Sequence, residues 1–198
     1  MKIDNWLFWI LAHTVVFPLA LLIGFIAVHL FSFIGQLFPE IIASGLGYIL
    51  WGGIVGGLIG LTQWFFLKRY QISSGWIWKS AVGFALAETL MVIILLSMGV
   101  DRNIDLILSF GMEIWTLTYF VGGGITGFLQ STYLKKFSLQ YRYWILANAF
   151  IWGISTLLWT ILIKYRIGGN AIILLGGLGL GILSALVLNL LLKKTRIE

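Results

Sequence analysis

One pattern of side chains occurs three times along this chain of 198 residues. Each copy has a tryptophan, a polar residue and an aromatic residue at intervals of four: Trp9, His13 and Phe17; Trp76, Ser80 and Phe84; Trp144, Asn148 and Trp152. Residues four apart lie above one another on an α-helix, so each set predicts a helix with this stripe on one face. The copies divide the chain into three units, at about 6–69, 70–136 and 137–198.

The composition predicts a protein whose solvent is the lipid bilayer. Apolar residues make up 60% of the chain and charged residues only 10%, far from the proportions of a soluble domain. The net charge of +6 does not indicate nucleic acid as a partner, because the basic residues stand at the ends of apolar runs. The chain has no cysteine, which excludes disulfides and thiolate metal sites. We expect no bound metal and no cofactor.

Six apolar runs are long enough to cross a membrane, which takes about 20 residues as a helix. They lie at 6–32, 46–67, 76–98, 111–134, 143–163 and 171–192. The chain is therefore expected to form a single all-α integral membrane domain, 1–198, with six transmembrane helices as three tandem two-helix repeats. Parallel repeats of this kind predict pseudo-threefold symmetry about an axis along the membrane normal.

The basic residues predict the orientation of these helices. Ten fall on one side of the predicted membrane: Lys2, Lys68, Arg69, Lys79, Lys135, Lys136, Arg142, Lys193, Lys194 and Arg196. Three fall on the other side: Arg102, Lys164 and Arg166. Positive residues favour the cytoplasmic side, so both termini are expected in the cytoplasm and the protein in an inner membrane, cytoplasmic or thylakoid.

The second helix of each repeat is expected to pack through glycines. They recur at intervals of four: Gly52, Gly56 and Gly60; Gly123 and Gly127; Gly177 and Gly181. Small residues at this spacing let two helix backbones approach closely in lipid. Glutamine follows in two copies, as Gln63 and Gln130. In the third copy, Gly177, Gly181 and Ala185 are interpreted as the counterparts of Gly52, Gly56 and Gly60. Leu188 then stands in place of the glutamine, and Asn189 follows it. Flexible glycines lining a path are the functional alternative.

Five polar residues are expected at similar depth, near the cytoplasmic edge: His13, Ser80, Asn148, Gln63 and Gln130. Polar groups in lipid are costly unless paired, so we expect them to face inward as a ring. Hydrogen bonding between helices is one reading of the ring, and contact with a passing solute is the other.

Glu88 is the most specific single candidate for a functional residue within the spans. It continues the stripe of Ser80 and Phe84, and lies twelve residues past Trp76, about 18 Å into the span. A carboxylate near the midplane costs on the order of 2.5–3.5 kcal/mol, and the sequence offers no basic residue at that depth. A proton or cation site is one interpretation. A neutral carboxyl, hydrogen-bonded to a neighbour such as Thr116, Thr118 or Ser155, is the other.

The segment 57–69, GLIGLTQWFFLKR, together with Trp76, Gly127 and Gln130, resembles the repeats of Gly-rich multispan membrane proteins of bacteria and cyanobacteria. The resemblance implies a multispan membrane fold and no particular activity. Ser131 departs from the pattern, since it stands where the tryptophan after glutamine is expected.

Catalytic motifs such as Gly-x-Ser-x-Gly, His-Glu-x-x-His or a P-loop do not occur, so we do not expect an enzyme. Two functional hypotheses remain open. The first is a transporter or channel-like protein for a small solute or ion. The second is a noncatalytic subunit, or a scaffold that binds a pigment, quinone or lipid within a larger membrane complex. Besides the bilayer, the partners considered are other membrane subunits or further copies of the chain.

Overall fold

A computed structural model describes residues 3–35, 40–97, 104–136, 140–165 and 171–193. These residues form six α-helices and one short 3-10 helix, and the helices fall where the apolar runs predicted them. Their bounds are α1 (Ile3–Gly35), α2 (Glu40–Leu67), η1 (Lys68–Tyr70), α3 (Gly75–Ser97), α4 (Ile104–Leu134), α5 (Tyr143–Lys164) and α6 (Ala171–Lys193). Of the charged residues used for the orientation, Lys2, Arg102, Arg166, Lys194 and Arg196 lie outside the described residues.

Five of the helices are long and apolar enough to cross a membrane. The candidate spans are Trp6–Phe31, Gly45–Tyr70, Gly75–Ser97, Tyr143–Leu162 and Ile173–Leu191. The exception among the six described helices is α4, which is long enough but more polar. The all-helical, membrane-embedded character follows from these spans, and the sixth span stays a prediction.

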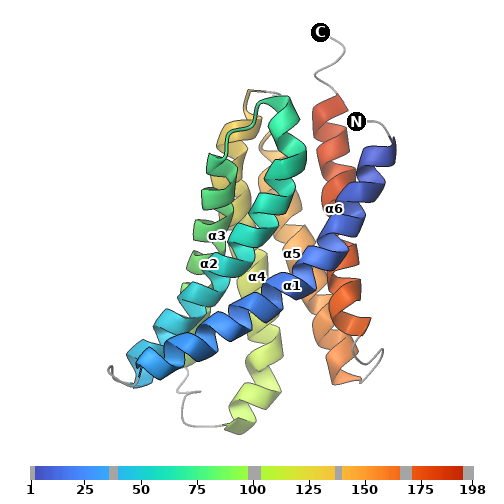
Figure 1. Ribbon diagram of the computed structural model, residues 1–198. Coiled ribbons are helices and arrows are strands. Elements are labelled where there is room, and N and C mark those ends of the chain that lie inside the picture. Colours follow the sequence, from blue (N-terminus) through green and yellow to red (C-terminus); the bar gives the residue numbers. More distant parts are fainter. Residues whose placement is uncertain (1–2, 36–39, 98–103, 137–139, 166–170, 194–198) are drawn as a thin grey trace.

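The helices form a closed ring in which each packs on its two neighbours along the chain and α6 packs on α1. Figure 1 shows that α1 begins and α6 ends at the same end of the molecule, here called the N/C end, where α2 also passes into α3. The opposite end is called the far end. Helix α1 crosses the bundle obliquely, so it lies beside α6 near the N/C end and diverges from it toward the far end (Figure 1).

The outside of the ring is apolar and much of its inside is polar or small. Large apolar side chains such as Phe8, Leu30 and Leu190 are more than 60% exposed, whereas Ser80, Gln130 and Thr126 are buried. This distribution is most marked in α4. Its buried face carries Thr118, Thr126 and Gln130, and its exposed face carries Leu117, Phe120 and Phe128. An apolar exterior of this extent is typical of contact with lipid rather than water.

The glycines lie where the backbones of neighbouring helices approach most closely. A methyl group placed on Gly56 would lie 2.6 Å from the Ser80 carbonyl oxygen of α3. One placed on Gly123 would lie 2.6 Å from the Asn148 carbonyl oxygen of α5, and one on Gly177 would lie 2.7 Å from that of His13 in α1. Each second helix of a repeat therefore packs on the first helix of the next repeat around the ring.

These contacts correct the expected register of the third copy. Gly177 meets the polar residue of the next stripe, as Gly56 and Gly123 do, so it corresponds to those glycines and not to Gly52. Gly181 then corresponds to Gly60 and Gly127, one turn later. The position of the glutamine is consequently occupied by Ser184. The assignment of that position to Leu188 was wrong by one helical turn, because the glycine spacing alone fits two registers equally well.

Candidate binding cavity and its polar floor

Three buried tryptophans form a layer near the N/C end. Trp9, Trp76 and Trp144 are each at most 1% exposed, although an indole is the largest of side chains. Their N–H groups all donate to a side chain of the adjacent second helix. The donor–acceptor distances are 3.0 Å from Trp9 to Ser184 Oγ, 3.0 Å from Trp76 to Gln63 Oε1 and 2.9 Å from Trp144 to Gln130 Oε1. The same kind of bond thus closes each contact between repeats.

The polar residues of the stripes lie one turn further into the bundle. Gln130 Nε2 donates to Ser80 Oγ at 2.8 Å and to Gln63 Oε1 at 3.4 Å, which joins α2, α3 and α4. Asn148 is buried and borders the same small space as these three side chains, whereas His13 Nδ1 donates to the Trp9 carbonyl of its own helix. The space between these groups does not admit a water molecule. The polar layer is therefore tightly packed between α2, α3, α4 and α5.

Three polar atoms of this region have no hydrogen-bond partner within the described part of the chain: His13 Nε2, Asn148 Nδ2 and Thr126 Oγ1. Of the five residues expected to form a ring, Gln63 and Ser80 are each bonded to Gln130. His13 and Asn148 lie at the same level without joining that network. The sequence did not single out Ser184 or Thr126, although Ser184 completes the set of acceptors.

An aromatic layer follows the polar one. Phe17, Phe84 and Trp152 close their stripes, and their rings gather around Trp152 with centroids 6.4 Å and 4.3 Å from it. Trp152 borders both the closed polar space and a much larger cavity on its other side. It therefore separates the two.

That cavity has a volume of about 370 Å³ and occupies the part of the bundle where α1 and α6 diverge. Helices α1, α2, α4, α5 and α6 all contribute to its wall. The wall is almost wholly apolar, and its aromatic residues are Phe17, Phe25, Trp51, Trp115, Tyr119, Trp152 and Trp159. Its polar side chains are few, as is usual for sites that bind small organic molecules.

Glu88 lies directly behind this wall. Its side chain is 2% exposed, and its Oε1 accepts a hydrogen bond of 2.5 Å from the Tyr119 hydroxyl. Tyr119 and Trp51 both border the cavity, so a hydrogen bond joins one residue of its wall to the carboxyl group. Gly52 makes room for Glu88, because a methyl group at Gly52 would lie 2.6 Å from Glu88 Cγ.

The donor to Glu88 is thus Tyr119, which sequence reasoning missed. Thr118 and Ser155, two of the expected donors, have unpartnered hydroxyls within the described residues. One signal was available: Tyr119 lies eleven residues before Gln130, as Gly52 lies eleven before Gln63. Tyr119 and Gly52 therefore stand at equivalent positions in two copies, and they contact Glu88 from two sides.

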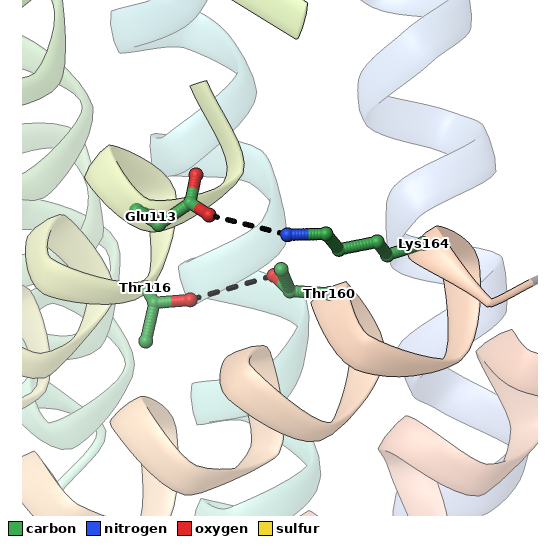
Figure 2. A network of polar contacts seen from close by, with 4 residues as sticks. All are labelled: Glu113, Thr116, Thr160 and Lys164. Carbon is green, nitrogen blue, oxygen red and sulfur yellow. Dashed lines mark hydrogen bonds and ion pairs between the residues drawn. The ribbon is translucent and has the colours of Figure 1, made fainter. Parts of the chain in front are cut away.

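The far end of the cavity is bordered by contacts between α4 and α5. The rings of Trp115 and Trp159 are stacked with centroids 5.6 Å apart. Figure 2 shows two polar contacts between α4 and α5 that lie outside the cavity wall, a Thr116–Thr160 hydrogen bond of 3.4 Å and an ion pair of 3.9 Å between Glu113 and Lys164. Both members of the ion pair are more than half exposed, so it contributes little to stability.

No family model, curated protein or solved structure matches this chain. Within the described residues, no group of three or more histidine, aspartate or glutamate side chains is placed to hold a metal ion. The geometry of the cavity and its surroundings is therefore the basis for a functional proposal.

Proposed function

We propose that all six helices span an inner membrane, with both termini in the cytoplasm and the three repeats related by a pseudo-threefold axis. The repeated contacts support the axis: three equivalent tryptophans donate to the preceding helix of the ring, and three equivalent glycines of that helix meet backbone carbonyl groups of the helix that carries the tryptophan. The apolar exposed face of α4 supports a sixth span, because Thr118, Thr126 and Gln130 within this helix face the bundle and not the lipid.

This topology is open to a direct test. Reporter domains fused at 71–74 and at 138–140 should report the cytoplasm, and one fused at 101–105 should report the opposite side. A reversed pattern, or a result requiring an odd number of spans, contradicts the arrangement.

We propose further that the protein is a transporter for a small organic solute. The observation that carries the proposal is a cavity of about 370 Å³ that adjoins an aromatic layer and a tightly packed, hydrogen-bonded layer on the N/C side. A transporter needs a binding site that opens to one side at a time, and a floor of side chains that can repack offers the second gate. A continuous channel is not favoured, because the polar layer leaves no room for water.

A noncatalytic scaffold that binds an apolar ligand is the second candidate. The almost wholly apolar wall favours it, since a lipid, quinone or pigment needs few polar contacts. The two candidates differ in one measurable respect: a transporter moves its ligand across the membrane, and a scaffold retains it.

The test uses proteoliposomes and three aromatic solutes that cross lipid slowly: benzyltrimethylammonium, benzenesulfonate and L-tryptophan. We expect uptake of at least one of them above that of protein-free liposomes. Leu22→Trp, which narrows the cavity at the surface of α1, should abolish the uptake. Leu19→Trp is the matched control, because Leu19 is similarly exposed on the same helix (48% against 54%) and does not border the cavity.

Uptake that is equal in the two variants would contradict transport through this cavity. Retention of a co-purifying ligand by the wild type and not by Leu22→Trp, without any uptake, would favour the scaffold.

A further inference from the structure

We propose that the ligand of the cavity is an organic cation with an apolar body, and that Glu88 supplies the opposing charge from behind Tyr119. This inference rests on the proposed function, because it names the class of solute that the same cavity takes.

The wall of the cavity is suited to a cation. Seven aromatic residues border it, and the faces of aromatic rings attract ammonium groups through their quadrupoles. No lysine or arginine belongs to the wall. Along the depth of the helices, none lies between Arg69 and Lys79, which are near the N/C end, and Lys164, which is near the far end. A positive charge in the cavity therefore meets electron-rich faces and no repulsion.

Glu88 adds a negative charge within reach of this wall. Its carboxyl group accepts the hydrogen bond of Tyr119, whose ring is part of the wall. A hydrogen bond to a charged acceptor polarises its donor, so an ionised Glu88 makes the ring of Tyr119 more electron-rich. The charge of an ionised Glu88 attracts a cation in the cavity and does not attract a neutral ligand.

The position of Glu88 is costly for the fold, which favours a functional role. An acid buried among transmembrane helices is unfavourable, and the sequence gives it no basic partner. The titratable groups that face it are Tyr48 from α2 and Tyr119 from α4, and neither carries a positive charge. The bound cation would itself be the missing counter-ion.

The surface of the cavity indicates the rest of the ligand. Leu22 and Phe25 border the cavity and are also 54% and 51% exposed on the outside of α1. A ligand that passes these side chains reaches the cavity from the lipid that the outside of α1 faces, so its charge has to be carried on an apolar body. Small quaternary ammonium compounds with an aromatic group meet both requirements.

Proton binding to Glu88 and cation binding then oppose each other. Protonation removes the negative charge behind the wall, so the affinity for the cation should fall as the pH is lowered. A variant that cannot ionise at residue 88 should lose this pH dependence.

The experiment measures equilibrium binding of radiolabelled benzyltrimethylammonium, benzenesulfonate and L-tryptophan to the purified protein in detergent. We expect the cation to bind most tightly. Glu88→Gln, which keeps the acceptor for Tyr119 and removes the charge, should weaken cation binding about tenfold or more, corresponding to at least 1.4 kcal/mol. The control is the double variant Glu113→Gln with Lys164→Met, which removes an exposed carboxylate with no change in net charge and should leave binding unchanged.

Tighter binding of benzenesulfonate or L-tryptophan, lost in Leu22→Trp, would overturn the cation assignment and leave the cavity as a solute site. Undiminished cation binding by Glu88→Gln would overturn the role of Glu88. Binding of none of the three solutes would refute the proposed function as well. Should Glu88→Gln fail to fold, the charge preference and pH profile of the wild type decide the question.

Discussion

The packing of the three repeats can be tested by adding one methyl group at a time. At Gly56, Gly123 and Gly177, the new methyl would lie 2.6, 2.6 and 2.7 Å from a backbone carbonyl oxygen of the next helix. A backbone oxygen cannot rotate away as a side chain does, so two helices have to separate. Overpacking of this kind costs about 1–3 kcal/mol.

A control for helix propensity is available within a residue or two in each repeat. A methyl on Gly57 would meet Ala81 at 3.7 Å, one on Gly124 would meet Ala149 at 3.7 Å and one on Gly179 would meet Ser155 at 3.8 Å. These are ordinary van der Waals contacts. Replacing glycine by alanine also favours the helix by up to about 1 kcal/mol, but this gain is common to both members of a pair. The difference within a pair therefore isolates the steric cost.

The assay is reversible unfolding in mixed micelles with increasing denaturing detergent. We expect Gly56→Ala to be less stable than Gly57→Ala by about 1–3 kcal/mol, with similar differences for Gly123→Ala against Gly124→Ala and Gly177→Ala against Gly179→Ala. Equal stability within the pairs would refute the close approach of the helices. A loss confined to one repeat would refute the equivalence of the three contacts.

Three further predictions use the same unfolding assay. Gln130→Leu should cost about 1–3 kcal/mol and more than Gln63→Leu, because Gln130 bonds to three other side chains and Gln63 to two; the reverse order would contradict the network. Ser184→Ala should cost about 1 kcal/mol, and in a double-mutant cycle with Trp9→Phe the coupling should be about 0.6 kcal/mol; zero coupling would show that this bond adds nothing. Lys164→Met should change stability by no more than about 0.5 kcal/mol, since its ion pair is exposed, and a larger loss would contradict that reasoning.

The sequence was sufficient to predict the helices and much of what faces inward. Length and apolar composition determine helical spans in lipid, because a backbone that finds no water has to bond within its own segment. Four-residue spacing placed Trp76, Ser80 and Phe84 on one face, and this face is buried. The same periodicity placed Glu88 at the fourth position of the stripe. These inferences are local, and each needs only the geometry of one helix.

The register in which the helices pack on one another was harder to predict from the sequence. The third glycine pair was assigned one turn away from its true position, because Gly177 and Gly181 fit two registers and only contact with His13 and Ile10 distinguishes them. The error concealed Ser184 as the acceptor for Trp9, a bond between residues 175 positions apart in the chain. Periodicity within a helix holds no information about which turn of a distant helix it meets.

The sequence by itself therefore determined the apolar solvent, the helical elements and the buried face of the stripes. The tertiary structure decided which helix meets which, that Tyr119 is the partner of Glu88, and that the oblique course of α1 leaves a cavity beside them. The physical reason is that burial is a property of one helical face, whereas a cavity exists only where several helices diverge. The volume between them depends on crossing angles and packing that no single segment specifies.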